Sequence, residues 1–316
     1  MRYSIVIPIY RNEESIEILL DNVALLANKL GALEVVFVVD GSPDRCLEKL
    51  EQQLPSAGFA SQLVVLSRNF GAFPAVTAGM SVARGEFIAV MSGDLQEPSG
   101  LSLRFFAAIE DGSCDVVLGR RIKRNDPWAT QITSACFWFL YRWAIQRDMP
   151  PGGIDVFACT QRVRDALTAL PESNTSLVGL LIWLGFRRCY VDYERLPRPF
   201  GRSSWSFRRK VRYLKDSMFG FSDLPIRILG WIGIIGLAAA LIMTTIVVVG
   251  KMIGGITLPG YSATSTMILF FGGLNSLGLS LIGEYIWRNF ENSKQRPRFV
   301  VFRHDHFSAA NEATVK

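Results

Sequence analysis

The stretch Phe87-Ile88-Ala89-Val90-Met91-Ser92-Gly93-Asp94-Leu95-Gln96 joins a short apolar run to a polar turn. The run has the composition of a buried strand, and the turn sets an acid and an amide two residues apart at its carboxyl end. Hard divalent cations prefer oxygen ligands, and Mg²⁺ typically takes only one or two from protein while phosphates supply others. Asp94 and Gln96 are therefore candidates for holding a cation together with a diphosphate. The plain alternative is a strand that ends in a polar turn.

Further apolar runs occupy residues 3–9, 34–39, 62–66 and 115–118. Between them lie stretches with helical spacing, the first of which has Ser15 as a plausible N-cap. Strands that alternate with helices indicate an α/β domain with a mainly parallel sheet covered on both faces. Ligands of such sheets gather at the carboxyl ends of the strands, so we expect Pro8, Asp40, Arg68 and Asp94 along one rim.

The second half of the chain is unusually apolar. The chain has 316 residues, of which 49% are hydrophobic, and a mean hydropathy of +0.24. The excess is concentrated in residues 228–250 and 252–283, neither of which contains a charged side chain. A helix needs about 20 residues to cross roughly 30 Å of hydrocarbon. We therefore expect a transmembrane hairpin with spans at about 226–250 and 264–287.

Basic residues predict how this hairpin is oriented. They precede the first span at Arg208, Arg209, Lys210, Arg212, Lys215 and Arg227, and follow the second at Arg288, Lys294, Arg296, Arg298 and Arg303. The segment between the spans carries only Lys251. Positive residues favour the cytoplasmic side, so we expect a multi-pass protein of the cytoplasmic (inner) membrane with its α/β domain and both termini in the cytosol. The net charge of +6 then suits anionic lipids and phosphate ligands better than nucleic acid.

The sequence divides into four parts. Residues 1–202 form the predicted α/β domain, 203–225 a juxtamembrane region, 226–288 the hairpin and 289–316 a cytoplasmic tail. In the juxtamembrane region, apolar residues recur at alternating spacings of four and three, as in an interfacial amphipathic helix. A surface helix packed on the domain is the alternative. Five dispersed cysteines and two histidines in the tail argue against a disulfide framework and against histidine-based catalysis.

Five motifs follow one another in a fixed order. They are Ile5-Val6-Ile7-Pro8-Ile9-Tyr10, Val39-Asp40-Gly41-Ser42-Pro43-Asp44, Ser67-Arg68-Asn69-Phe70-Gly71, Gly93-Asp94-Leu95-Gln96-Glu97-Pro98 and Gly283-Glu284-Tyr285. Together they resemble the polyprenyl-phosphate glycosyltransferases of glycosyltransferase family 2, which include relatives of dolichyl-phosphate mannose synthase and of bactoprenol glucosyltransferases. The resemblance implies a Rossmann-like GT-A fold and inverting transfer of a sugar from a nucleotide sugar, UDP-glucose first, to a polyprenyl phosphate such as undecaprenyl phosphate. It also implies Mg²⁺ or Mn²⁺ as cofactor.

The resemblance assigns roles to individual residues. Metal and diphosphate would be held by Asp94 and Gln96, and the nucleotide sugar by Pro8, Tyr10, Glu13, Asp40, Arg68 and Arg121. The acceptor phosphate would be bound by Arg120, Ser134, Arg198 and Arg202. Besides Asp94, the second catalytic candidate is Asp155, which could orient the acceptor or accept a proton, or could simply cap a helix. The arginines could instead be solvated or face lipid headgroups.

The sequence departs from the family pattern at several positions. The first acid of the usual Asp-x-Asp element is replaced by Ser92, and other differences fall at Arg11, Ala72, Thr130, Gln131 and Ser204. These changes could mean another donor sugar, altered metal use or lost catalysis.

Two alternatives to the predicted enzyme therefore stay open. One is a membrane-anchored pseudo-enzyme that acts as a binding or partner protein. The other is a family 2 enzyme with a different acceptor, such as a polysaccharide synthase, although the sequence has only two predicted spans and no Gln-x-x-Arg-Trp element. Small residues in the second apolar run, at Gly272, Gly273, Gly278 and Gly283, suit close helix packing and predict a homo-oligomer held by the spans.

Overall fold

The computed structural model describes residues 1–123, 138–139, 141–143, 145–150, 153–172, 176–200, 207–253 and 260–309. The strands are β1 (Tyr3–Ile9), β2 (Leu33–Val39), β3 (Ala60–Leu66), β4 (Phe87–Val90), β5 (Val116–Lys123), β6 (Phe157–Thr160), β7 (Arg188–Glu194) and β8 (Val301–Phe307). The helices are α1 (Ile16–Leu30), α2 (Cys46–Gln53), α3 (Ala72–Val82), α4 (Leu101–Glu110), α6 (Gln161–Ala169), α7 (Leu177–Trp183), α8 (Phe207–Phe221), α9 (Leu224–Met252) and α10 (Tyr261–Ser293). Short 3₁₀ helices span Glu13–Ser15 and Leu54–Ser56.

The strands form one mixed sheet in the order β7-β5-β6-β4-β1-β2-β3-β8. The inner strands β3, β2, β1 and β4 run parallel, with Ile5 of β1 opposite Val35 of β2 and Ala89 of β4. All seven side chains of β2 are buried. Such continuous burial requires cover on both faces, which explains why these strands read as unbroken apolar runs.

The outer strands break the parallel pattern. β6 runs antiparallel to both β4 and β5, while β7 runs parallel to β5. At the opposite edge, β8 runs antiparallel to β3. Because β6 is reversed, the residues that precede it lie at the edge where β4, β5 and β7 end. This edge therefore gathers segments that are far apart in the sequence.

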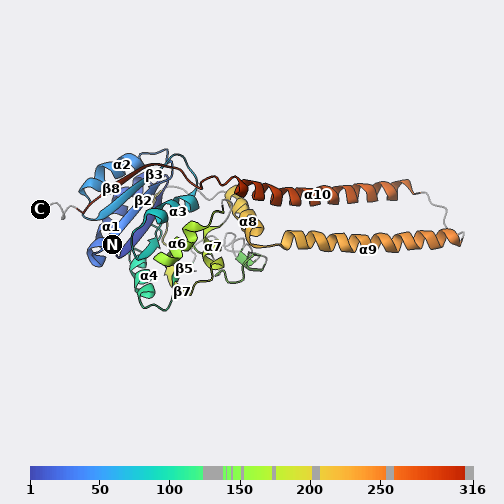
Figure 1. Cartoon of the computed structure of the whole chain (residues 1–316), viewed down its shortest axis with the longest axis horizontal. Helices are drawn as coiled ribbons and strands as arrows, with labels where there is room; N and C mark the ends of the chain where they lie inside the picture. Colours follow the sequence, from blue (N-terminus) through green and yellow to red (C-terminus); the bar gives the residue numbers. More distant parts are fainter. Residues whose placement is uncertain are drawn as a thin grey trace.

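Helices cover both faces of the sheet (Figure 1). On one face, α1, α2 and α4 pack on alternate strand residues such as Ile7 and Phe37. On the other face, α3, α6 and α7 pack on the intervening residues such as Val6 and Val38. Successive side chains of a strand point to opposite faces of the sheet, so a strand buried on both faces contributes alternate residues to each side of the core.

Two long helices, α9 and α10, extend side by side away from the sheet, and α8 lies where they meet the domain (Figure 1). Ion pairs join α8 to α10: Lys215 Nζ lies 2.7 Å from Glu284 Oε2, and Arg288 Nη2 lies 2.8 Å from Asp216 Oδ1. Within the described ranges, no single helix meets the length and hydropathy requirements for crossing a membrane. The pair Tyr213–Phe221 and Leu224–Gly236, bent by 74°, meets them jointly. The predicted transmembrane hairpin stays a prediction.

The structure confirms the predicted α/β class but corrects two details. Ser15 does not cap α1 through its side chain; its hydroxyl donates instead to the carbonyls of Asn12 (2.9 Å) and Gly93 (3.0 Å). The predicted tail contains β8, so residues 1–202 do not make up the whole sheet. The strand was missed because its sequence, VFRHDHF, has four consecutive polar residues at its centre and shows neither an apolar run nor an apolar–polar alternation.

Gly79 tests how closely α3 sits on the sheet. A Cβ atom at this position would lie 2.3 Å from Val6 Cγ1 and 2.9 Å from Val38 Cγ2. Gly79→Ala should therefore lower the free energy of unfolding by about 1–3 kcal/mol, the usual cost of overpacking a core. Thermal unfolding in a neutral detergent measures this, with Gly58→Ala as control because a Cβ there meets no atom within 4 Å. Equal melting temperatures for the two variants would contradict the packing described here.

Candidate active site

The turn after β4 projects Asp94 and Gln96 from the edge where the parallel strands end. Leu95, between them, has φ of +57°, a left-handed conformation that a branched side chain rarely adopts. Just before the turn, Gly93 approaches β1 so closely that a Cβ would lie 3.1 Å from the Pro8 carbonyl oxygen. Strained backbone of this kind persists only where surrounding contacts hold it, and it concentrates at functional sites.

Asp94 is held by three contacts. Its Oδ1 accepts from Ser92 Oγ at 2.7 Å and from the Gln96 backbone N–H at 3.3 Å. Its Oδ2 forms an ion pair with Arg198 Nη2. The side chain of Asp94 is only 10% exposed, so this carboxylate needs a cationic partner.

The same arginine begins a continuous charged cluster, made up of Asp94, Gln96, Arg121, Asp155, Arg195 and Arg198. Arg198 Nη2 also lies 3.4 Å from Gln96 Oε1, which in turn accepts from Arg195 Nη2 at 2.5 Å. Arg195 Nη1 lies 3.4 Å from Asp155 Oδ2, and Arg121 Nη2 lies 2.6 Å from Asp155 Oδ1. The ends of β4, β5 and β7 and the segment before β6 thus meet through alternating carboxylates and guanidiniums.

Glu97 lies beside this cluster and is half-buried, with its Oε2 fully enclosed. Its Oε2 has no hydrogen-bond partner among the residues described. Burial, together with the negative charges of Asp94 and Asp155, raises the pKa of Glu97 to about 8. At neutral pH this carboxyl is therefore mostly protonated, and the cluster carries less negative charge than its residue types indicate.

A second group of contacts forms where β2 and β3 end. Asp40 is 2% exposed, and its carboxylate accepts from the backbone N–H groups of Phe70 (2.7 Å) and Gly71 (2.9 Å) at the start of α3. The guanidinium of Arg68 lies over the Phe70 ring at 4.1 Å. Asp40 therefore fixes the loop that carries Arg68, a positioning role that the sequence did not predict.

The remaining predicted site residues are placed differently. Glu13 lies after β1, and the backbone N–H and the side chain of Arg45 hydrogen-bond to it and lower the pKa of its carboxyl. Arg120 forms two hydrogen bonds to Asp192, at 2.6 and 3.0 Å, and takes no part in the charged cluster. Pro8 and Tyr10 lie at the end of β1, beside the turn that carries Asp94. Ser134 and Arg202 lie outside the described residues.

Two residues of the site escaped the sequence analysis. Arg195 bridges Gln96 and Asp155, and Glu97 supplies the buried carboxyl. Weak signals existed, since Arg195 lies three residues before Arg198 and Glu97 directly follows Gln96. Neither signal separates these residues from ordinary surface charges, because their environment depends on strands that meet only in the fold.

The side-chain oxygens at this edge supply only part of what a divalent cation requires. Within the described part of the chain, no group of three or more His, Cys, Asp or Glu side chains is arranged to hold a metal. Asp94 Oδ2 and Gln96 Oε1 nevertheless converge on one cationic atom, Arg198 Nη2. Two protein oxygens are enough for Mg²⁺ when phosphates and water complete its shell. The residues fit a cation held jointly with a ligand, not a closed protein site.

Comparison with known proteins identifies the family. The sequence profile described as "Glycosyl transferase family 2" matches residues 4–167. An uncharacterized glycosyltransferase of Synechocystis sp. is 31% identical over 94% of this chain and 94% of its own length. A prophage bactoprenol glucosyl transferase homolog of Escherichia coli is 29% identical over 96% of this chain and 99% of its own length. A mannosyltransferase of Pyrobaculum calidifontis, solved with GDP-Man and Mn²⁺, is 17% identical over 90% of this chain and 87% of that chain, with a TM-score of 0.48.

The buried Glu97 should make stability depend on pH. With a pKa near 8 in the folded protein and an ordinary lower value in the unfolded chain, the folded state binds the extra proton between these two values. The free energy of unfolding should therefore fall as pH rises from about 5 to about 8. Glu97→Gln should remove this component, so its melting temperature relative to wild type should increase across that range.

Thermal unfolding at pH 5.5, 7.0 and 8.5 measures this difference. Glu86→Gln is the matched control, because Glu86 is exposed. Parallel pH profiles for wild type and Glu97→Gln would refute the raised pKa of Glu97.

Proposed function

We propose that this chain, which belongs to glycosyltransferase family 2 and is a glycosyltransferase, transfers a sugar with inversion from a nucleotide sugar to a membrane polyprenyl phosphate. Undecaprenyl phosphate is the proposed acceptor, and UDP-glucose is the first donor to test. The observation that carries the proposal is the charged cluster at the sheet edge, in which Asp94 and Gln96 converge on Arg198. The E. coli relative is named for glucosyl transfer to bactoprenol, which supports this choice of acceptor and sugar.

The arginines of the cluster suit the leaving group. A nucleoside diphosphate leaves with negative charge, and preorganised cations at that position stabilise the transition state. The side chain of Arg121 is only 11% exposed, and its Nε is buried without a partner among the described residues. Guanidinium forks match phosphoryl oxygens, so Arg121, Arg195 and Arg198 would share the diphosphate.

Asp155 is placed to act on the acceptor side. It lies between Arg121 and Arg195, so its carboxylate is held in one orientation by both guanidiniums. A phosphate acceptor is already anionic at neutral pH, so it needs little help from a general base. Asp155 would therefore mainly orient the acceptor relative to the donor sugar, or take up its remaining proton.

Asp94 and Gln96 would hold Mg²⁺ or Mn²⁺ together with the donor diphosphate. Bound there, the cation would supply further neutralisation of the diphosphate charge. In that arrangement Arg198 would be released from Asp94 to contact a phosphate oxygen. Ser92, which donates to Asp94 Oδ1, would orient this carboxylate without adding a ligand charge.

The proposed site of action is the cytosolic surface of the inner membrane, with α9 and α10 as the transmembrane hairpin. Large apolar side chains on these helices are exposed in the isolated chain, for example Trp231 (65%), Phe270 (62%) and Leu279 (67%). Exposed apolar surface on this scale needs a lipid or protein partner. A lipid-facing hairpin would keep the catalytic edge close to the acceptor headgroup.

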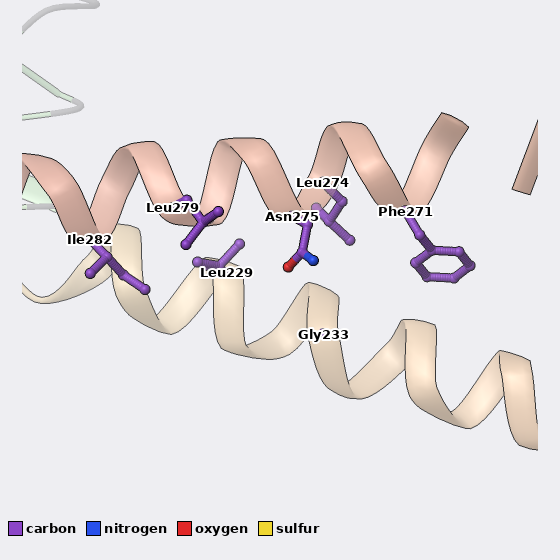
Figure 2. Close-up of a pocket in the computed structure, with 8 residues that line it drawn as sticks. Leu229, Gly233, Phe271, Leu274, Asn275, Leu279 and Ile282 are labelled. Atoms are coloured by element: carbon purple, nitrogen blue, oxygen red, sulfur yellow. The ribbon is translucent and has the colours of Figure 1, made fainter. Parts of the chain in front are cut away.

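The two helices leave a cleft of about 400 Å³ between them. Figure 2 shows Asn275 pointing from α10 toward α9, between Leu229 and Gly233. Small residues and a polar amide within an apolar hairpin are features that promote helix association. We therefore propose that the chain forms a homo-oligomer through the hairpin.

A catalytically impaired binding protein is the second candidate, favoured by the departures from the family pattern, above all Ser92 in place of an acid. The geometry of Asp94, which Ser92 helps to fix, weakens that alternative. The two candidates make opposite predictions for turnover.

Transfer is tested by incubating the detergent-solubilised protein with undecaprenyl phosphate, a panel of radiolabelled nucleotide sugars and Mg²⁺ or Mn²⁺. Label should enter the lipid fraction with one donor and identify the sugar. Asp94→Ala should lower the rate by at least about 100-fold, because it removes the carboxylate that would hold the cation at the leaving diphosphate, while Asp21→Ala, on the exposed face of α1, should not. Nucleotide binding without transfer from any donor would favour the impaired binding protein.

The orientation of the hairpin is tested by cysteine labelling in a cysteine-free variant. Thr264→Cys lies at the far end of α10, and Ser293→Cys lies at its domain-proximal end. A membrane-impermeant maleimide added to intact cells should label position 264 and not position 293, because basic residues retain the domain end in the cytosol. Labelling of both positions in intact cells, or of neither position until the cells are lysed, would rule out this topology.

A further inference from the structure

Residues 294–300, here called the strap, lead from the end of α10 to β8. Gln295 turns the chain with φ of +47°. Phe299 packs into the core on the α3 face of the sheet, and the carbonyl of Val300 accepts from the Ser67 N–H at 3.0 Å. The strap therefore crosses the domain at its hairpin side and ends beside the loop that carries Arg68.

Arg298 lies within this strap with its guanidinium partly buried. Its Nη2 is fully enclosed and has no hydrogen-bond partner among the residues described. Burial lowers the pKa of Arg298, and Glu172 opposes this through its charge without a hydrogen bond in the described structure. An arginine remains protonated at neutral pH even so, because its ordinary pKa lies far above neutrality.

Unlike Arg298, other basic residues of this region form ion pairs with acidic side chains that the structure describes. Arg288 pairs with Asp216 and Glu284, Lys294 pairs with Glu291 at 2.6 Å, and Arg303 pairs with Glu51 and Asp305. Arg298 has a buried donor and no such partner in the described part of the chain. An enclosed guanidinium nitrogen that no described residue accepts from is costly, so it suits an anion bound from outside the described part of the chain.

We propose that Arg298 binds the phosphate group of a membrane lipid at the junction of hairpin and domain. The inference rests on the proposed position at the membrane surface, where lipid phosphates are the abundant anions. A planar guanidinium can donate two parallel hydrogen bonds to phosphoryl oxygens, which suits a half-enclosed position. The phosphate belongs either to the polyprenyl phosphate acceptor or to an anionic phospholipid.

This site would be linked to the sheet edge through short contacts. The strap bonds to Ser67, and the adjacent loop is held by the carboxylate of Asp40 through Phe70 and Gly71. A lipid phosphate at Arg298 would fix the strap next to that loop. Arg298 is therefore a lipid-binding residue separate from the charged cluster at Asp94.

Binding is measured on the full chain in a neutral detergent, by titration with undecaprenyl phosphate, dioleoylphosphatidylglycerol and undecaprenol. Arg298→Gln should weaken binding of a phosphate-bearing lipid by about ten-fold or more, the usual loss for a charge-assisted hydrogen bond. Arg296→Gln is the matched control, because Arg296 is exposed in the same strap. Arg298→Lys should restore part of the affinity by keeping the charge.

The outcomes separate the two lipid sources. Loss confined to undecaprenyl phosphate identifies the acceptor, and equal loss for phosphatidylglycerol identifies a general headgroup site. Unchanged affinity of Arg298→Gln for both phosphates, or an equal loss for undecaprenol, overturns the inference. The titration does not depend on sugar transfer. If the protein binds lipid phosphate through Arg298 but transfers no sugar, the proposed function is contradicted while this inference stands.

Melting temperature without lipid gives a second readout. Removing a buried cation that lacks a partner should leave Arg298→Gln at least as stable as wild type. A lower melting temperature, with Arg296→Gln unchanged, would show that Arg298 serves an internal ion pair and would overturn the inference.

Discussion

The ion pair between Asp94 and Arg198 is the interaction on which the site depends. It joins residues 104 positions apart in the sequence, one in the turn after β4 and the other after β7. Neither charge could be enclosed alone at this edge, because a buried ion without a partner costs several kcal/mol. The pairing therefore requires the two segments to be built together. Once they are, Gln96 and Asp155 fall within reach of Arg195, and the cluster closes around Arg121.

Chain topology explains why the hairpin and the catalytic edge are linked. The chain leaves the sheet at β7 on one edge, passes through α8, α9 and α10, and returns to the opposite edge as β8. The sheet is thus incomplete without residues that follow the hairpin. Ion pairs of Lys215 and Arg288 between α8 and α10 add a third connection at the base of the hairpin. The position of the hairpin relative to the catalytic edge is fixed from both ends.

The sequence predicts the parts of this fold that are locally determined. The inner strands could be predicted because burial on both faces requires unbroken apolar runs, and Asp94 and Gln96 because they directly follow one of them. β8 and the reversed β6 could not be assigned in this way, since their pairing is decided by distant strands. The role of Asp40 in binding the nucleoside stays a prediction. The hydrogen bonds that its carboxylate accepts from two backbone N–H groups could not be predicted, because they depend on the position of the neighbouring loop.

The charge balance of the site explains how it tolerates serine at position 92. Three guanidiniums, of Arg121, Arg195 and Arg198, face three carboxyl groups, of Asp94, Glu97 and Asp155. Because the raised pKa of Glu97 keeps that group largely protonated at neutral pH, the balance is positive before any cation is counted. An aspartate at position 92 would cancel this excess beside Asp94. With Ser92, the arginines of the proposed site would attract a diphosphate, and a divalent cation would add to that attraction without being its only source.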